Sequence, residues 1–302
     1  RSLYNASLEQ RITAYSSHKK SFSRYDQIKE LPALKEQCPE FSEVGSQVLQ
    51  EVIERLDKAY QAFFRRIKKG DTPGFPRFRG KYRYNSFVLK QTGWKLQGNR
   101  LHIKNVGIFK LKFSRPIEGE IKTVSVRLSA TGKWFVSFSC DNVPTKLLPK
   151  TGKSIGIDVG CESFLTDSNG KKIENPRWLN RSKAVLAMRQ QRLSKRVKGS
   201  SRRSKARILV AAAHEKVCNQ RRDFHFKLAK KLVADNDAIY IEGMKAWNSS
   251  KPLNRSMRDA AWFGFFEILK AKAEEAGREV IEVSAAYTSQ MCSNCGAIAP
   301  KK

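Results

Sequence analysis

Apolar residues recur at steps of three and four along three stretches of the chain, which is the spacing of an amphipathic helix. In the first stretch the apolar positions include Val48, Val52, Leu56 and Phe63, and we assign this stripe to a core. Gly277, a typical helix stop, follows the last stretch. The three predicted helices are residues 42–69, 206–233 and 256–276.

Between these helical patterns the chain has short runs of alternating apolar and polar residues, which predict β-strands. Turn signals at Gly98, Gly107 and Gly132 separate the runs. Segment 141–153 contains two prolines and is predicted to be a linker into a second domain. We therefore expect a small antiparallel barrel or sandwich before the linker. Its predicted strands are residues 87–89, 101–103, 109–113, 123–127 and 134–138.

After the linker, strands and helices alternate. The apolar run 153–160 is followed by a hairpin pattern around Asn169 and Gly170, which is a strong two-residue turn signal. Two more predicted strands, residues 238–242 and 279–283, follow the second and third helices. This order predicts an α/β domain with a mixed sheet.

An acid closes two of these predicted strands: Asp158 follows Ile157, and Glu242 follows Ile241. Burying an unpaired carboxylate costs several kcal/mol, so we expect both to lie at strand ends facing a metal, a cation or water. Hard oxygen ligands suit Mg²⁺ or Mn²⁺, which can catalyse phosphodiester hydrolysis. Two carboxylates are few for such a site, and a third is expected.

The charge of the chain favours a polyanionic partner. Lys and Arg total 59 against 28 acids, for a formal net charge of +31. Residues 181–207 carry many Lys and Arg and no acid, whereas a solvated face normally mixes signs. Nucleic acid is the first hypothesis and an anionic membrane the second. No apolar run approaches the ~20 residues that cross a bilayer, so we expect a soluble, cytoplasmic protein without a membrane partner.

Two smaller motifs add to this interpretation. Cys292 and Cys295 form the close pair of a zinc half-site, and the other four cysteines are scattered. In segment 75–84 aromatic residues alternate with Arg and Lys, a composition that can stack on bases while neutralising phosphates. Aromatic residues beside a turn are, however, more often packing anchors.

Several motifs together resemble the TnpB family of transposon-encoded RNA-guided DNA nucleases, relatives of the compact type V CRISPR effectors. The resemblance covers nearly the whole chain. It rests on Ile155-Gly156-Ile157-Asp158-Val159-Gly160, Ile239-Tyr240-Ile241-Glu242-Gly243, the segment 287–296 with its cysteine pair, the helical segment 214–224, and Gly74-Phe75-Pro76-Arg77-Phe78-Arg79.

The resemblance implies a multidomain α+β fold. Residues 1–72 would be a helical recognition region and 73–148 a wedge-type antiparallel β-barrel. Residues 149–286 would be an RNase H-like RuvC nuclease domain, and 287–302 the start of a zinc-binding, target nucleic-acid-binding insert.

The resemblance also implies function and site residues. The protein would act as a monomer with a guide RNA derived from the transposon end. It would cleave double-stranded DNA beside a short transposon-adjacent motif, using Mg²⁺ or Mn²⁺ held by Asp158 and Glu242, with Zn²⁺ held by Cys292 and Cys295. Candidates for contacting the motif are Tyr25, Ser46, Gln47, Gln50, Lys90 and Gln91. Other nucleic-acid-binding candidates are Phe75, Arg77, Phe78, Arg79, Arg189, Arg192, Lys195, Arg196, Arg202, Arg203, Arg221 and Arg222.

Three family features are absent from residues 1–302: the first wedge strand, the second cysteine pair and the third carboxylate. Two alternatives therefore stay open. One is a nuclease-inactive, RNA-guided DNA-binding repressor of the same lineage, although retention of both acids argues against it. The other is a structural RNA-binding protein, which would need neither the acids nor the cysteine pair.

Overall fold

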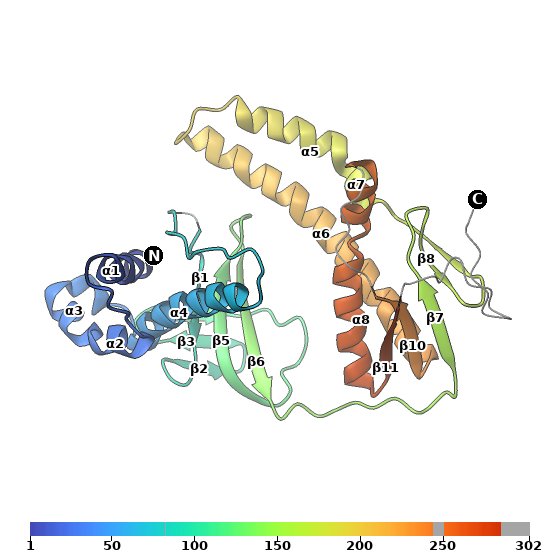
Figure 1. Cartoon of the computed structure of the whole chain (residues 1–302), viewed down its shortest axis with the longest axis horizontal. Helices are drawn as coiled ribbons and strands as arrows, with labels where there is room; N and C mark the ends of the chain where they lie inside the picture. The colour runs from blue at the N-terminus through green and yellow to red at the C-terminus, as the bar shows by residue number, and fades with distance from the viewer. Residues whose placement is uncertain (82, 244–250, 285–302) are drawn as a thin grey trace. The chain divides into compact units, whose positions relative to one another are not determined.

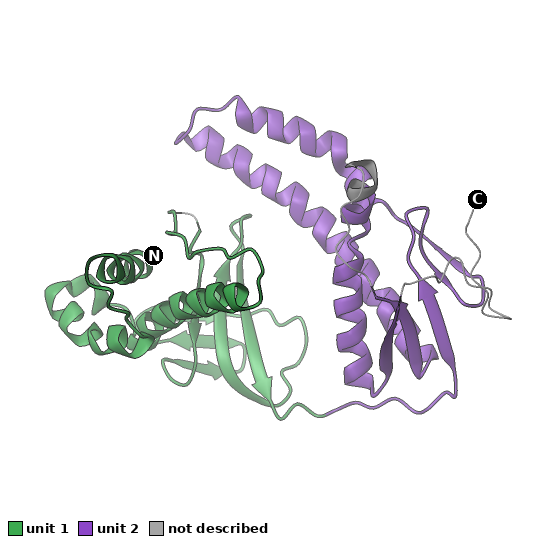
Figure 2. Ribbon diagram, viewed as in Figure 1, with its two compact units in different colours: residues 1–144 green, residues 145–302 purple. Residues whose placement is uncertain are grey.

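A computed structural model describes residues 1–81, 83–243 and 251–284. The chain divides into two compact units, residues 1–144 and 145–302, each with its own core (Figures 1 and 2). Among the described residues, no helix is both long and apolar enough to span a bilayer.

Unit 1 begins with helices that pack around one apolar cluster. Tyr4 and Leu8 of the first helix meet Leu49, Ile53 and Leu56 of the fourth in this cluster. The fourth helix confirms the stripe predicted over residues 42–69. The helices are α1 (Ser2–His18), α2 (Arg24–Lys29), α3 (Leu31–Gln37) and α4 (Ser46–Lys68), with a 3₁₀ turn at Pro39–Phe41.

Six strands follow in unit 1 and form two three-stranded antiparallel sheets, ordered β1-β5-β6 and β2-β3-β4. Both sheets contribute to one core, which contains Leu89, Leu101, Ile103, Val124 and Val126. The strands are β1 (Ser86–Leu89), β2 (Trp94–Gln97), β3 (Arg100–Ile103), β4 (Gly107–Lys110), β5 (Glu120–Leu128) and β6 (Trp134–Asp141).

The closed barrel expected here is not found among the described residues, because no strand pairing joins the two sheets. Closing a barrel requires tilted strands with a continuous stagger of hydrogen bonds. Strands β2, β3 and β4 have four residues each, which corresponds to about 13 Å of extended chain and is short for wrapping around a core. The sequence pattern also missed β2 as a separate strand.

Unit 2 contains a mixed five-stranded sheet in the order β11-β10-β7-β8-β9. Strand β10 is parallel to both β7 and β11, whereas β8 and β9 are antiparallel additions. The mixed sheet confirms the fold expected for this half of the chain. The strands are β7 (Ser154–Asp158), β8 (Ser163–Asp167), β9 (Lys172–Glu174), β10 (Ala238–Glu242) and β11 (Glu279–Val283).

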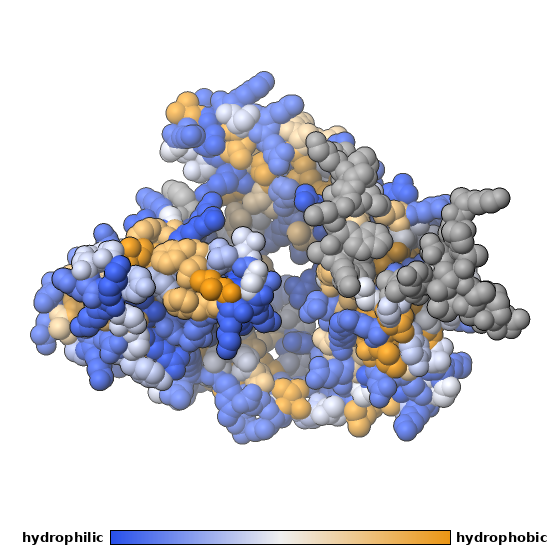
Figure 3. All heavy atoms as spheres, in the orientation of Figure 1, coloured by the Kyte–Doolittle hydropathy of each residue, from blue (hydrophilic) through white to orange (hydrophobic). Residues whose placement is uncertain are grey.

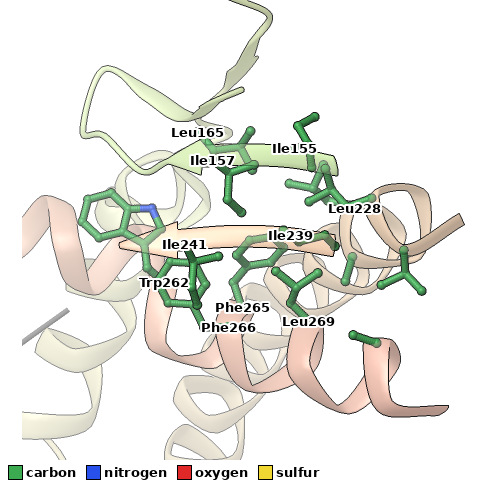
Figure 4. Packing of buried hydrophobic residues seen from close by; sticks show 14 of the residues in the cluster. Ile155, Ile157, Leu165, Leu228, Ile239, Ile241, Trp262, Phe265, Phe266 and Leu269 are labelled. Carbon is green, nitrogen blue, oxygen red and sulfur yellow. The ribbon is translucent and has the colours of Figure 1, made fainter. Parts of the chain in front are cut away.

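Two helices cover one face of this sheet. Helix α6 (Ser201–Asp235) contributes Leu228, and α8 (Trp262–Ala276) contributes Phe265 and Leu269 (Figure 4). Leu232 of α6 belongs to the same core. The two helices pack on the inward-facing residues of the adjacent strands β7 and β10. These residues are Ile155 and Ile157 in β7 and Ile239 and Ile241 in β10. Because strand side chains alternate between faces, the intervening Gly156 and Tyr240 lie on the opposite face.

Two helical predictions need correction. Helix α5 (Trp178–Ser194) lies in the basic run, where few apolar residues mark a period, and it was not predicted. The helix expected over 256–276 is two helices, α7 (Lys251–Ala260) and α8, separated by Ala261 in the left-handed region with φ 55°. No glycine or proline marks this break in the sequence. The predicted stop at Gly277 is confirmed, with φ 67°.

An ion pair anchors the starts of the three parallel strands. Arg278, which is 6% exposed and precedes β11, contacts the Asp237 carboxylate before β10. It also donates to the carbonyl oxygens of Pro149 at 2.6 Å and Val233 at 3.3 Å. Asp237 in turn accepts from the backbone N–H groups of Thr151 at 2.9 Å and Gly152 at 2.7 Å, just before β7. These hydrogen bonds, chiefly the one from Thr151, lower the pKa of the Asp237 carboxyl.

We expect Arg278→Leu to lower the free energy of unfolding by about 2–3 kcal/mol, because the carbonyl oxygens and the carboxylate lose a buried donor. Urea denaturation of the full-length protein measures this. Arg258→Leu is the matched control, since Arg258 is exposed on α7 and the charge change is the same. Equal unfolding free energies for the two variants would contradict the anchoring role.

Candidate nuclease site

The two predicted catalytic acids lie at the same edge of the unit 2 sheet. Asp158 is the last residue of β7 and Glu242 the last of β10. These strands are parallel neighbours, and the register pairs Ile157 with Ile241, one position before the acids. Adjacent strands are about 4.8 Å apart, so the register brings the backbones carrying the two carboxylates side by side. Alternation places both side chains on the face opposite the core.

Local backbone contacts hold this edge in place. The Gly243 N–H, directly after Glu242, donates to the Val283 carbonyl oxygen at 2.9 Å and so joins the ends of β10 and β11. On the other side, Ser168 exchanges hydrogen bonds with the backbone of Gly156 in β7, at 2.8 and 3.3 Å. The turn that carries Ser168 is the predicted Asn-Gly hairpin, with Gly170 at φ 77°.

Both carboxylates are available to a ligand. Within the described ranges, neither Asp158 nor Glu242 has a hydrogen-bond or ion-pair partner for its side chain. Asp158 is exposed and Glu242 half-buried. Two carboxylates at the ends of adjacent strands can share one cation as ligands. Their oxygen atoms are the donors that Mg²⁺ prefers. No group of three or more His, Cys, Asp or Glu that could hold a metal occurs in the part of the chain described.

Helices α5 and α6 form an antiparallel hairpin that carries the basic run 181–207 (Figure 1). Arg192, Lys195, Arg196 and Arg202 are exposed along it. Three other residues predicted to bind nucleic acid also make contacts within the protein. Arg189 donates to Leu209 O at 2.8 Å, Arg203 to Leu193 O and Arg196 O at 2.9 and 2.7 Å, and Arg221 lies 3.5 Å from Asp259. Arg222 lies 5.4 Å from the ring of Phe226 and is exposed.

Asp259, which sequence reasoning missed, ties this hairpin to the helices over the sheet. Its carboxylate is 8% exposed and accepts from the N–H groups of Leu179 at 2.8 Å and Asn180 at 3.0 Å. It thereby caps the start of α5, where Arg177 makes no side-chain cap. A cap that comes from 80 residues downstream leaves no local sequence signal.

Beside it, His225 of α6 is buried and its Nε2 lies 3.1 Å from the Ala260 carbonyl oxygen. Burial lowers the pKa of His225 to about 4, so the ring is neutral near pH 7 and can donate to that carbonyl. The ring packs among Phe164, Phe224 and Phe265. His225 therefore has a structural role in the core.

We expect Asp259→Ala to lower the free energy of unfolding by about 1–2 kcal/mol, the usual cost of losing a helix cap. Hydrogen exchange at the Leu179 and Asn180 amides should accelerate, because their acceptor is gone. Asp223→Ala is the control, since Asp223 makes an exposed pair with Lys227 at 2.8 Å and should change stability by less than about 0.5 kcal/mol. Unchanged exchange at both amides would contradict the capping role.

Five of the six predicted motif-contacting residues lie at the start of α4 or directly after β1, and the sixth, Tyr25, lies on α2. Gln47 donates to Thr92 Oγ1 at 2.9 Å and accepts from the Thr92 N–H at 3.2 Å, joining these segments. Lys35 donates to Ser46 Oγ at 2.7 Å, and Lys90 pairs with Glu54. Gln50 and Gln91 are exposed. Tyr25, on α2, is 61% exposed, with the Arg24 guanidinium 4.7 Å from its ring.

The predicted aromatic and basic segment makes packing contacts and also leaves side chains exposed, and its contact with nucleic acid stays a prediction. Phe75 packs edge-on against Tyr60 at 5.6 Å and Phe63 at 5.3 Å, yet stays 47% exposed. The backbone of Arg79 makes two hydrogen bonds with the side-chain amide of Asn5. The Arg79 N–H donates to Asn5 Oδ1 at 2.8 Å, and Asn5 Nδ2 donates to the Arg79 carbonyl oxygen at 3.1 Å. Phe78 and Arg77 are exposed. Cys292 and Cys295 lie outside the described residues.

Comparisons with known proteins identify the family. A family model described as a probable transposase matches residues 137–251, and a Cas12f1-like TNB domain model matches 262–302. A putative RNA-guided DNA endonuclease of Streptomyces pristinaespiralis is 32% identical over the whole chain, which covers 76% of that protein. The chain belongs to the TnpB family. This membership confirms the resemblance found in the sequence, and the family is one of RNA-guided DNA endonucleases.

Other TnpB relatives agree. The putative RNA-guided DNA endonuclease InsQ of Escherichia coli strain K12 is 30% identical over 83% of the chain, which spans 65% of that protein. The CRISPR-associated endodeoxyribonuclease Cas12f1 of Sulfoacidibacillus thermotolerans is 25% identical over 64% of the chain and 49% of that protein. A cryo-EM structure of a Cas12f1–sgRNA–target DNA complex matches with a TM-score of 0.56 at 14% identity, over 98% of this chain and 73% of that one. That likeness supports the multidomain α+β fold.

Proposed function

We propose that this TnpB-family chain cleaves double-stranded DNA beside a short transposon-adjacent motif, directed by a guide RNA from the transposon end. The observation that carries the proposal is the pair of acids, Asp158 and Glu242, at the ends of adjacent parallel strands. The names of the relatives support it, since two are putative RNA-guided DNA endonucleases. They do not favour the repressor or the structural RNA-binding alternative.

The two acids would hold Mg²⁺ or Mn²⁺, in a unit that we interpret as an RNase H-like RuvC domain. A bound divalent ion lowers the pKa of water and stabilises negative charge on phosphate oxygens. The chain's own contribution is to present two carboxylates at a fixed strand spacing on the face of the sheet opposite the core of unit 2. A third carboxylate and the zinc site of Cys292 and Cys295 stay predictions, as does a single protein chain per complex.

The hairpin would supply phosphate contacts. Its exposed cations, which include Arg192, Lys195 and Arg202, lie in a segment without acids and can replace the counterions of a nucleic acid. In such systems base pairing to the guide reads the target sequence, while the protein reads the short motif and the backbone shape. The predicted motif contacts at the start of α4 suit that division.

We expect Asp158→Asn and Glu242→Gln each to reduce DNA cleavage by at least about a hundredfold, a loss typical of removing charge stabilisation at an active site. The assay uses the full-length protein purified with its co-expressed RNA, plasmid DNA and Mg²⁺. EDTA should stop cleavage, and added Mg²⁺ or Mn²⁺ should restore it. The control is Glu279→Gln. Glu279 is the first residue of β11 and so lies at the strand end away from the two acids, and this variant should cleave DNA normally.

The same preparations separate catalysis from binding. Both acid variants should retain RNA and DNA binding, because among the described residues neither side chain makes a hydrogen bond or ion pair that would stabilise the fold. Cleavage that survives in either variant would remove that residue from the site. RNA-dependent DNA binding without any cleavage by the unmodified protein would favour the repressor.

For the hairpin, we expect the triple variant Arg192→Gln, Lys195→Gln and Arg202→Gln to bind nucleic acid more weakly. The slope of log affinity against log salt should fall by roughly 0.7–0.9 per lost phosphate contact. Lys122→Gln is the control, because Lys122 is already paired with Glu120 at 2.9 Å. A salt slope that is unchanged in the triple variant would exclude the hairpin from the interface.

A further inference from the structure

The α5–α6 hairpin has little apolar packing of its own. In α5, which is described throughout, only Leu186 is buried, and the buried residues of α6 begin at Ala213. Val185, Met188 and Leu209 are 43%, 42% and 53% exposed. In Figure 3 the hairpin, at the top of the view, shows hydrophilic residues with scattered apolar ones between them. Apolar burial therefore contributes little to holding the hairpin in place.

Polar contacts hold the hairpin together along its length. Arg189 of α5 donates to the Leu209 carbonyl oxygen of α6 at 2.8 Å. In the other direction, Arg203 of α6 donates to the Leu193 carbonyl oxygen of α5 at 2.9 Å. These hydrogen bonds join the two helices to each other, but they do not join the hairpin to the sheet.

At its base, the Asp259 carboxylate of α7 contacts both helices of the hairpin. Its two oxygen atoms accept from the N–H groups of Leu179 and Asn180 in the first turn of α5. Its Oδ1 also lies 3.5 Å from Arg221 Nη2 in α6. Helix α6 is held by the core at its C-terminal half, so Asp259 gives the hairpin a second point of support, at the start of α5.

This second support is itself fixed to the core beneath the candidate catalytic edge. Met257 and Ala260, on either side of Asp259, pack in the core of unit 2. The same core contains Ile157 and Ile241, each of which directly precedes one of the two acids. A continuous set of packed and hydrogen-bonded residues therefore connects the base of the hairpin to the acids.

A small change of angle at the base becomes a large displacement at the tip. Helix α5 has 17 residues and is therefore about 25 Å long. A rotation of about 10° at its start would move its other end by about 4 Å, more than the ~3.4 Å between successive base pairs of a duplex. A long helix that projects beyond the core bends easily unless a neighbour supports it. The support at Asp259 thus matters on the scale of one nucleotide.

We propose that Asp259 is a positioning residue, which fixes the angle of the hairpin and so sets where cleavage falls along the nucleic acid that the hairpin holds. This inference rests on the proposed function. Asp259 is 8% exposed and its oxygen atoms already face three internal donors, so it acts through the hairpin and not by touching the substrate. A cap with a purely structural role would alter stability and leave the cut position unchanged.

The test maps the cut ends on both DNA strands by sequencing, using the full-length protein with its co-expressed RNA, Mg²⁺ and a plasmid target. In Asp259→Ala, the fraction of cuts at the principal position should fall at least twofold, and new cuts should appear at neighbouring nucleotides. The salt dependence of nucleic-acid binding should not change, because no cation is removed. Asp259→Asn keeps one acceptor oxygen and should broaden the cut positions less. If Asp259→Ala does not fold, Asp259→Asn decides the question alone.

Ser200→Ala is the matched control. Ser200 Oγ accepts from the Arg203 N–H at 3.1 Å and caps the start of α6 at the hairpin tip, away from α7. The variant loses a cap of the same kind without affecting the base of the hairpin. Its cut positions should match those of the unmodified protein. Equal broadening in Ser200→Ala and Asp259→Ala would overturn the proposal, since general loosening of the hairpin would then explain both.

Two other results would also overturn the proposal. One is an unchanged distribution of cut positions in the Asp259 variants. The other is complete loss of cutting in both, because Asp259 would then be needed for cleavage itself and not for its position. Failure of the unmodified protein to cleave with its RNA would instead contradict the proposed function, so the two hypotheses fail in different measurements.

Discussion

The candidate catalytic edge depends on an ion pair at the other end of its strands. Asp237 and Arg278 hold the starts of β7, β10 and β11 in one cluster, together with the backbone of Thr151 and Gly152. Parallel strands have no short turn to fix their register, so a tertiary contact must do it. One register places Ile157 beside Ile241 and therefore Asp158 beside Glu242. A slip of one residue would turn one carboxylate toward the core.

Local sequence pattern was sufficient to locate the two acids, but only the family resemblance implied that they share one site. An apolar run that ends in an acid predicts a strand-end carboxylate, and the structure has both acids there. Their pairing depends on Arg278, which lies 129 positions from its acceptor Pro149. Local pattern carries no information about such a contact. The Asn-Gly hairpin, by contrast, was predictable because its geometry is set within a few residues.

Helices show the same division between local and distant causes. Helix α4 was predictable because apolar residues occupy a full stripe along it. Helix α5 was missed because Leu186 is its only buried residue and its start is capped by the distant Asp259. The break at Ala261 has no local signal either. Five of the six strands of unit 1 were predicted, but which strands pair is set by the shared core.

The α5–α6 hairpin is inserted in the connection between β9 and β10, and α6 contributes to the sheet's core through its C-terminal half, at Leu228, Ala229, Leu232 and Val233. A helix of 35 residues is about 50 Å long, so its N-terminal half extends well past the strands. Insertions or deletions at the hairpin tip would leave the sheet and its two acids unaltered. Related chains could thus evolve different reach along a nucleic acid while inheriting one cleavage chemistry.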